Sequence, residues 1–129
     1  EMAKRLKTKN LHPQILYSSP ALRAISTARY FAHEFGIAQS DIIQDPEIYD
    51  ALTDTLFDCT NRMDDQADFV ALFGHNPAIT DLVNKFCGAD IYNIPTCGIA
   101  LIQFPFDSWN MLSVGTGELI LYDYPKNEH

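Results

Sequence analysis

The chain has 129 residues and 47% of them are hydrophobic, so it is long enough to bury one core. It carries 17 acidic and 9 basic residues, a formal net charge of −8. This charge disfavours a nucleic-acid backbone or an anionic membrane as a partner, because both repel an acidic surface. We therefore expect one globular domain over residues 1–129. Any site that binds an anion must be confined to a small part of its surface.

The three cysteines, Cys59, Cys87 and Cys97, are widely spaced and form no Cys-x-x-Cys pair. They lie among apolar neighbours, which favours buried thiols over metal ligands. No signal peptide or long apolar span is visible. The sequence thus predicts a cytoplasmic protein that uses no metal and no cofactor.

The first ten residues have the pattern of a helix that is already under way. Met2 and Leu6 are four residues apart, Asn10 is a plausible stop, and no N-cap residue precedes them. We therefore expect the protein to have further residues upstream of Glu1.

The next segments alternate between strand and helix patterns. A β-rich run at 14–18 precedes a helical pattern at 20–35, which Gly36 closes. A short strand at 41–44 precedes a second helical face, made of Leu52, Leu56, Cys59 and Met63.

A continuous apolar run at 69–73 predicts a strand covered on both faces, and the helix after it ends near Gly88. A strand at 98–104 comes next, and the segments 110–114 and 118–124 predict a hairpin around Gly115-Thr116-Gly117. Alternating strands and helices predict an α/β fold with a mostly parallel sheet, helices on both faces and an antiparallel edge.

Three of the predicted strands are followed by a capping residue and a proline: Ser19-Pro20, Asp45-Pro46 and Asn76-Pro77. Ser, Asp and Asn accept hydrogen bonds from the free amides of a first helical turn, and proline fits the first helical position. Capping alone is a sufficient explanation of these pairs.

Capping does not explain Arg23 and His75. Arg23 lies near the positive end of its predicted helix, where a cation is disfavoured, and His75 follows a strand at the edge where open α/β sheets hold ligands. If strands 14–18 and 69–73 are neighbours, both side chains converge on a site for phosphate. The alternatives are a solvated arginine and a histidine with a structural hydrogen bond.

The segments YSSPALRAISTA (17–28) and FGHNPAIT (73–80) resemble the histidine phosphatase superfamily, specifically its small SixA-type phosphohistidine phosphatases. PEIYDA (46–51), IPTCGIALIQF (94–104) and GELILYDYPK (117–126) match in the same order. The resemblance implies a three-layer α/β/α sandwich of the phosphoglycerate mutase-like type. It also implies transfer of a phosphoryl group to a histidine and then to water.

The resemblance assigns four groups to the pocket, and two of them match Arg23, as a phosphate clamp, and His75, as a donor to the phosphoryl oxygens. The other two belong to an Arg-His-Gly triplet that carries the nucleophile, and this sequence has no such triplet. We expect residues 1–129 to be a histidine phosphatase domain that lacks its N-terminal strand and catalytic loop.

Three further residues are weaker candidates. Glu47 matches the region where some relatives place a general acid, although a carboxylate in a first helical turn is also favourable by itself. Ser19 could donate to the phosphate but is better explained as a cap. Asn76 could present its backbone amide to the anion while its side chain caps the helix.

The sequence therefore predicts a phosphatase for phosphohistidine or a related small phosphorylated substrate. The partner would be a phosphorylated protein or a small phosphorylated molecule, and neither nucleic acid nor a membrane is expected. The alternative is a non-catalytic phosphate-binding or regulatory module of the same fold.

Overall fold

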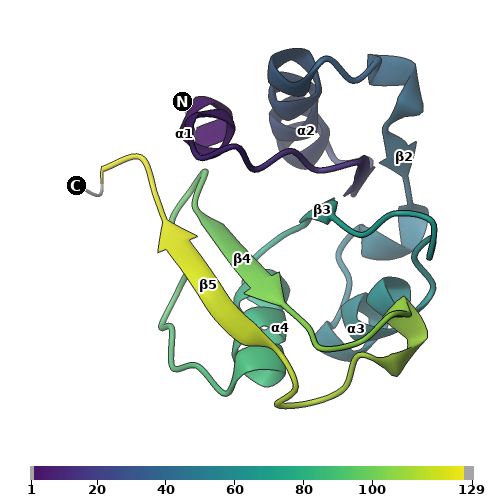
Figure 1. Ribbon diagram of the computed structural model, residues 1–129, viewed down its shortest axis with the longest axis vertical. Coiled ribbons are helices and arrows are strands. Elements are labelled where there is room, and N and C mark those ends of the chain that lie inside the picture. The colour runs from purple at the N-terminus through teal and green to yellow at the C-terminus, as the bar shows by residue number, and fades with distance from the viewer. Residues whose placement is uncertain (1, 127–129) are drawn as a thin grey trace. The chain divides into compact units, whose positions relative to one another are not determined.

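The computed structural model describes residues 2–126 (Figure 1). Contacts divide them into two compact units, and each unit is described by itself. The first contains the residues up to Asp50 together with Gln66–His75. The second contains Ala51–Asp65 together with the residues from Asn76 onward.

The first unit is built on a three-stranded parallel sheet with the order β2-β1-β3. Its strands are β1 (Ile15–Ser18), β2 (Ile43–Gln44) and β3 (Val70–Phe73). Helix α2 (Leu22–Phe35) packs against β1 and β3, and α1 (Met2–Thr8) packs against α2. The parallel sheet and its flanking helices confirm the α/β prediction for this part of the chain.

Local sequence signals explain where these helices end. Gly36 follows α2 with a φ of 69°, and Asn10 follows α1 with a φ of 63°. Glycine and asparagine tolerate this left-handed conformation best, so both helices stop where the sequence predicts.

The sequence predicts that the strand at 69–73 is covered on both faces, but all four residues of β3 are only half-buried. The reason is that β3 is an edge strand that pairs with β1 alone.

The second unit contains α3 (Thr53–Asn61), α4 (Ala78–Cys87) and an antiparallel pair of strands, β4 (Ile99–Gln103) and β5 (Glu118–Asp123). The two helices pack together, and α4 also contacts both strands. Phe86 lies at the centre of an aromatic cluster, with ring centroids 4.7 Å from Phe57 and 4.9 Å from Phe104. The antiparallel strands that the sequence predicts are therefore present as a separate two-stranded ladder.

The predicted partner of β5 is wrong. Residues 110–114 form no strand: they overlap a short 3₁₀ helix, η3 (Trp109–Met111), and β5 pairs with β4. The amide of Asn61 on α3 donates to the carbonyls of Trp109 and Leu112, at 2.8 and 3.1 Å. These two hydrogen bonds from α3 satisfy carbonyl groups that would otherwise pair with β5 in a hairpin.

No helix within residues 2–126 is both long enough and apolar enough to cross a bilayer.

None of the three cysteines forms a disulfide, and they differ in exposure. Cys59 is buried, as expected, whereas Cys97 is exposed, so the prediction of a buried thiol is wrong there. Cys97 has a φ of 63° and precedes Gly98, in the turn that leads into β4.

Cys97 is expected to react with iodoacetamide faster than Cys87. Burial raises the pKa of the Cys87 thiol, so at pH 8 a smaller fraction of Cys87 is the reactive thiolate. Peptide mass spectrometry after short labelling times measures both rates in one sample. Equal rates at the two thiols would contradict the burial of Cys87.

Candidate active site

The carboxyl ends of β1, β2 and β3 meet at one edge of the parallel sheet. Ser18 lies opposite Phe73 in the register of β1 and β3, and the Ser19 amide donates to the Phe73 carbonyl at 2.9 Å. On the other side, the Asp45 amide donates to the Ser18 carbonyl at 2.9 Å. The phosphate site predicted from the sequence requires strands 14–18 and 69–73 to be neighbours, and the structure confirms that they are.

His75 and Ser19 are in direct contact at this edge. The Ser19 side chain is completely buried, and its Oγ lies 2.8 Å from His75 Nε2. The same Oγ accepts a hydrogen bond from the Ala21 amide at 3.2 Å. The serine hydroxyl thus links the loop after β1 to the residue that follows β3, and it restricts the position of the imidazole.

The Ser19 hydroxyl also determines which imidazole nitrogen is available to a ligand. A hydroxyl has one hydrogen and two lone pairs, and one lone pair already accepts from Ala21. When Ser19 donates its hydrogen to Nε2, a neutral His75 carries its own hydrogen on Nδ1. Nδ1 is then the nitrogen that can donate to a bound oxyanion.

Tyr49 contacts the same imidazole and was not identified from the sequence. Its ring packs edge-on against His75, with the ring centroids 6.3 Å apart and the planes at 77°. The tyrosine ends the 3₁₀ helix η2 (Pro46–Ile48), which Asp45 caps. The Asp45-Pro46 pair indicated a turn at this edge of the sheet, but the sequence did not show which of the following side chains faces His75.

Arg23 is the second residue of α2, so it lies within the first turn of the helix that follows Ser19. Its side chain is exposed, and the first turn of α2 contains no acidic residue. Among residues 2–126, no carboxylate forms an ion pair with Arg23, and no hydrogen bond joins it to His75. A cation beside free helix amides without a protein counter-ion is an arrangement that favours an anion.

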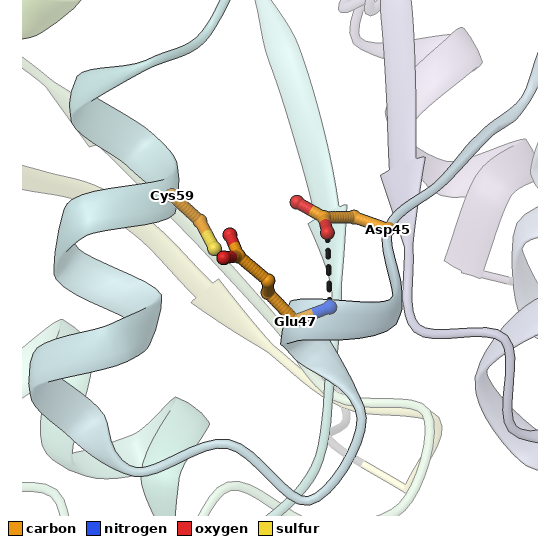
Figure 2. A group of neighbouring side chains, drawn as sticks. All are labelled: Asp45, Glu47 and Cys59. Carbon is orange, nitrogen blue, oxygen red and sulfur yellow. Dashed lines mark hydrogen bonds between the residues drawn. The ribbon is translucent and has the colours of Figure 1, made fainter.

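Figure 2 shows the turn that carries Glu47. The Glu47 amide donates to Asp45 Oδ1 at 2.9 Å, so Asp45 is the N-cap and Pro46 occupies the first helical position, as predicted. The helix they start is the short η2, whereas α3 begins only after Leu52. The Glu47 side chain is exposed.

The other two proline turns differ from the prediction. Helix α2 begins at Leu22, two residues after Pro20, so Ser19 caps the Ala21 amide rather than an amide of the helix. The Asn76 side chain caps no amide either: its Oδ1 accepts from the Thr80 hydroxyl, and its Nδ2 donates to the Ile94 carbonyl. In both turns, the side chain therefore forms hydrogen bonds with groups other than the first amides of the helix.

A cavity of about 430 Å³ lies elsewhere in the first unit. Its lining includes Gln14 and Ile15 at the start of β1, and Gly36 and Ile37 after the end of α2. The side-chain Oε1 of Gln14 already accepts hydrogen bonds from the backbone amides of Asp68 and Phe69. This cavity lies at the amino end of β1 and contains none of the predicted site residues.

No protein-family model matches the chain, and no curated protein matches it either. Solved structures do match. SixA from Agrobacterium tumefaciens is 24% identical with a TM-score of 0.77, over 96% of this chain and 75% of that one. SixA from Nakamurella multipartitia is 18% identical with a TM-score of 0.76, over 98% and 78% of the two chains.

A third match is the protein histidine phosphatase SixA complexed with tungstate. It is 21% identical with a TM-score of 0.69, and the alignment covers 94% of this chain and 74% of that chain. All three likenesses extend over nearly the whole of this chain. The chain therefore has the fold of the SixA phosphohistidine phosphatases, as the resemblance of its motifs implied.

Proposed function

We propose that the protein is a phosphatase that hydrolyses phosphohistidine through a phosphohistidine enzyme intermediate. The observation that carries this proposal is the buried Ser19 hydroxyl bound to His75, at the edge of the sheet where the helix of Arg23 begins. The SixA structure complexed with tungstate supports it, since tungstate is a tetrahedral oxyanion like phosphate.

The chemistry of this edge suits a phosphoryl group. Arg23 offers two parallel N–H donors, the first turn of α2 offers free amides, and His75 offers Nδ1–H. During transfer, negative charge spreads over the equatorial oxygens of the phosphoryl group. Donors fixed around those oxygens stabilise the transition state more than the ground state, which is the requirement for a faster reaction.

The reaction also needs a nucleophile, and we propose that it is the histidine of an Arg-His-Gly triplet upstream of Glu1. In the first step, the enzyme histidine forms an N–P bond while the substrate N–P bond breaks and the leaving nitrogen takes a proton. In the second step, water forms an O–P bond, the enzyme N–P bond breaks, and the proton that the water loses passes to the histidine nitrogen. Inorganic phosphate leaves and no electron is transferred.

The edge of β3 supports an additional strand as the carrier of this nucleophile. In the three-stranded sheet, β3 pairs on one side only, and its backbone groups on the other side are available for pairing. A strand added there would end beside His75, which follows β3 by two residues. We propose that residues 1–129 and this strand together form one histidine phosphatase domain.

We assign the supporting roles in the pocket to Ser19, Asn76 and Glu47. Ser19 fixes the His75 imidazole with its buried hydroxyl. The proposal gives the Asn76 backbone amide the role of a donor to the anion. Glu47 protonates the leaving group, and its turn ends at Tyr49, which contacts His75.

Glu47→Gln is expected to slow the hydrolysis of an alkyl phosphate ester by about 10-fold and to leave phosphoramidate hydrolysis nearly unchanged. An alkoxide leaving group needs a proton from an acid, whereas the nitrogen of phosphoramidate leaves already protonated. Steady-state rates on the two substrates measure the effect, and Glu34→Gln on α2 is the matched control. Equal rates for Glu47→Gln and wild type on the ester would exclude Glu47 as the acid.

The direct test of the proposed function is phosphate release by the complete protein, with its upstream residues. Peptides that carry phosphohistidine are compared with a panel of small phosphomonoesters. We expect the peptides to have the highest kcat/KM. Turnover of neither group would contradict the proposal.

We also propose that the protein acts in the cytoplasm. None of its three cysteines is in a disulfide, as is usual for proteins of a reducing compartment.

A further inference from the structure

Tyr49 combines a fixed backbone with an exposed ring. Its amide donates to the Pro46 carbonyl at 3.1 Å, the Ile48 amide donates to the Asp45 carbonyl at 3.0 Å, and the Asp45 side chain caps the same turn. Three hydrogen bonds therefore hold the backbone of residues 45–49. The side chain is nevertheless 60% exposed. One edge of the aromatic system contacts His75, and much of the ring is left open to a ligand.

A comparison with Tyr30 shows that exposure is not the distinguishing feature of Tyr49. Tyr30 lies on α2 in the same unit and is 76% exposed, but it makes no ring contact with the residues that the structure describes. Single exposed aromatic side chains are common and need no function. The distinguishing feature of Tyr49 is its contact with the imidazole that we propose binds the phosphoryl group.

The contact with His75 places the Tyr49 ring within reach of the group attached to the phosphorus. An oxygen that accepts a hydrogen bond from His75 lies about 3 Å from the imidazole nitrogen. The phosphorus and the leaving-group atom follow one and two bonds further on. The Tyr49 ring centroid is 6.3 Å from the imidazole centroid, so a planar leaving group at this position can pack against the tyrosine.

A second exposed apolar side chain lies beside the other proposed phosphate ligand. Leu22 precedes Arg23 in the first turn of α2 and is 75% exposed. A site for a sugar phosphate would need polar donors for hydroxyl groups around the phosphate. Tyr49 instead offers an apolar ring beside the His75 imidazole, and Leu22 adds exposed apolar surface in the first turn of α2.

We propose that Tyr49 is a specificity-determining residue that packs against the imidazole ring of a phosphohistidine substrate. The proposal rests on the proposed phosphatase function and deepens it. It assigns to Tyr49 the recognition of the planar leaving group, while Arg23 and His75 hold the phosphoryl group itself.

The test compares two substrates that both contain a phosphorus–nitrogen bond but differ in the ring. Phosphohistidine peptide has an imidazole leaving group, and phosphoramidate has none. Tyr49→Ala is expected to lower kcat/KM for the peptide by roughly 3- to 10-fold, the range of one aromatic contact, and to change kcat/KM for phosphoramidate by less than about 2-fold. Tyr49→Phe keeps the ring and should behave as wild type on both substrates.

Tyr30→Ala is the matched control and should change neither rate. A loss of equal size on both substrates would overturn the proposal, because it would mean that Tyr49 acts only by holding His75. An unchanged rate on the peptide would overturn it as well. If the wild-type protein turned over neither substrate, the phosphatase function itself would be wrong, a result distinct from any pattern among the Tyr49 variants.

Discussion

His75→Ala is expected to lower the turnover of a phosphohistidine peptide by at least about 100-fold, the scale of one lost transition-state donor. The imidazole is held by Ser19 at 2.8 Å. In the proposed mechanism, its other nitrogen donates to the phosphoryl oxygens. Because the substrate binds through other groups as well, the loss should appear mainly in kcat. Phosphate-release kinetics under saturating substrate measure it.

The control for this variant is His33→Ala. His33 lies exposed on α2, so its removal should leave turnover unchanged. Circular dichroism and thermal melting show whether His75→Ala is still folded. A folded His75→Ala protein with wild-type turnover would remove His75 from the mechanism.

Arg23→Ala is expected to have an effect of similar size, at least about 100-fold on turnover. The guanidinium can grip two phosphoryl oxygens at once, and Lys in its place would keep the charge but lose the paired geometry. Arg23→Lys should therefore fall between wild type and Arg23→Ala. Arg29→Ala, an exposed arginine on the same helix, is the control.

The same variant has an expected effect on stability that is opposite in sign. Arg23 lies in the first turn of α2 without an acidic partner among the described residues, and a cation there opposes the helix dipole. Its removal should raise the free energy of unfolding by about 0.3–1 kcal/mol at low salt. A variant that is less active and no less stable indicates a residue retained for binding an anion, whereas a clear loss of stability would indicate a structural role.

The sequence predicted best the features that depend on near neighbours. Gly36 ends α2 and Asp45 caps the turn at Pro46, because a left-handed residue and a capping carboxylate act over a few residues. The places of Arg23 in the first turn of a helix and of His75 just after a strand were predicted correctly for the same reason, since both depend on local signals.

Features that depend on distant parts of the chain could not be predicted. Ser19 and His75 are 56 residues apart, and their contact exists only because β1 and β3 pair in one register. The segment at 110–114 has a strand-like composition, but Asn61 holds it in a 3₁₀ turn from 48 to 51 residues away. The hydrophobic periodicity of a segment contains no information about contacts with distant residues. For this reason, β5 was assigned to the wrong partner strand.

The central claim is that Arg23 and His75 bind one oxyanion together. Titration of the complete protein with tungstate, followed by nitrogen-15 NMR of the imidazole and guanidinium groups, tests it directly. We predict that the signals of His75 and Arg23 shift with the same Kd, and that Arg23→Ala weakens the response of His75. Signals that do not move, or that follow two different dissociation constants, would contradict a shared site.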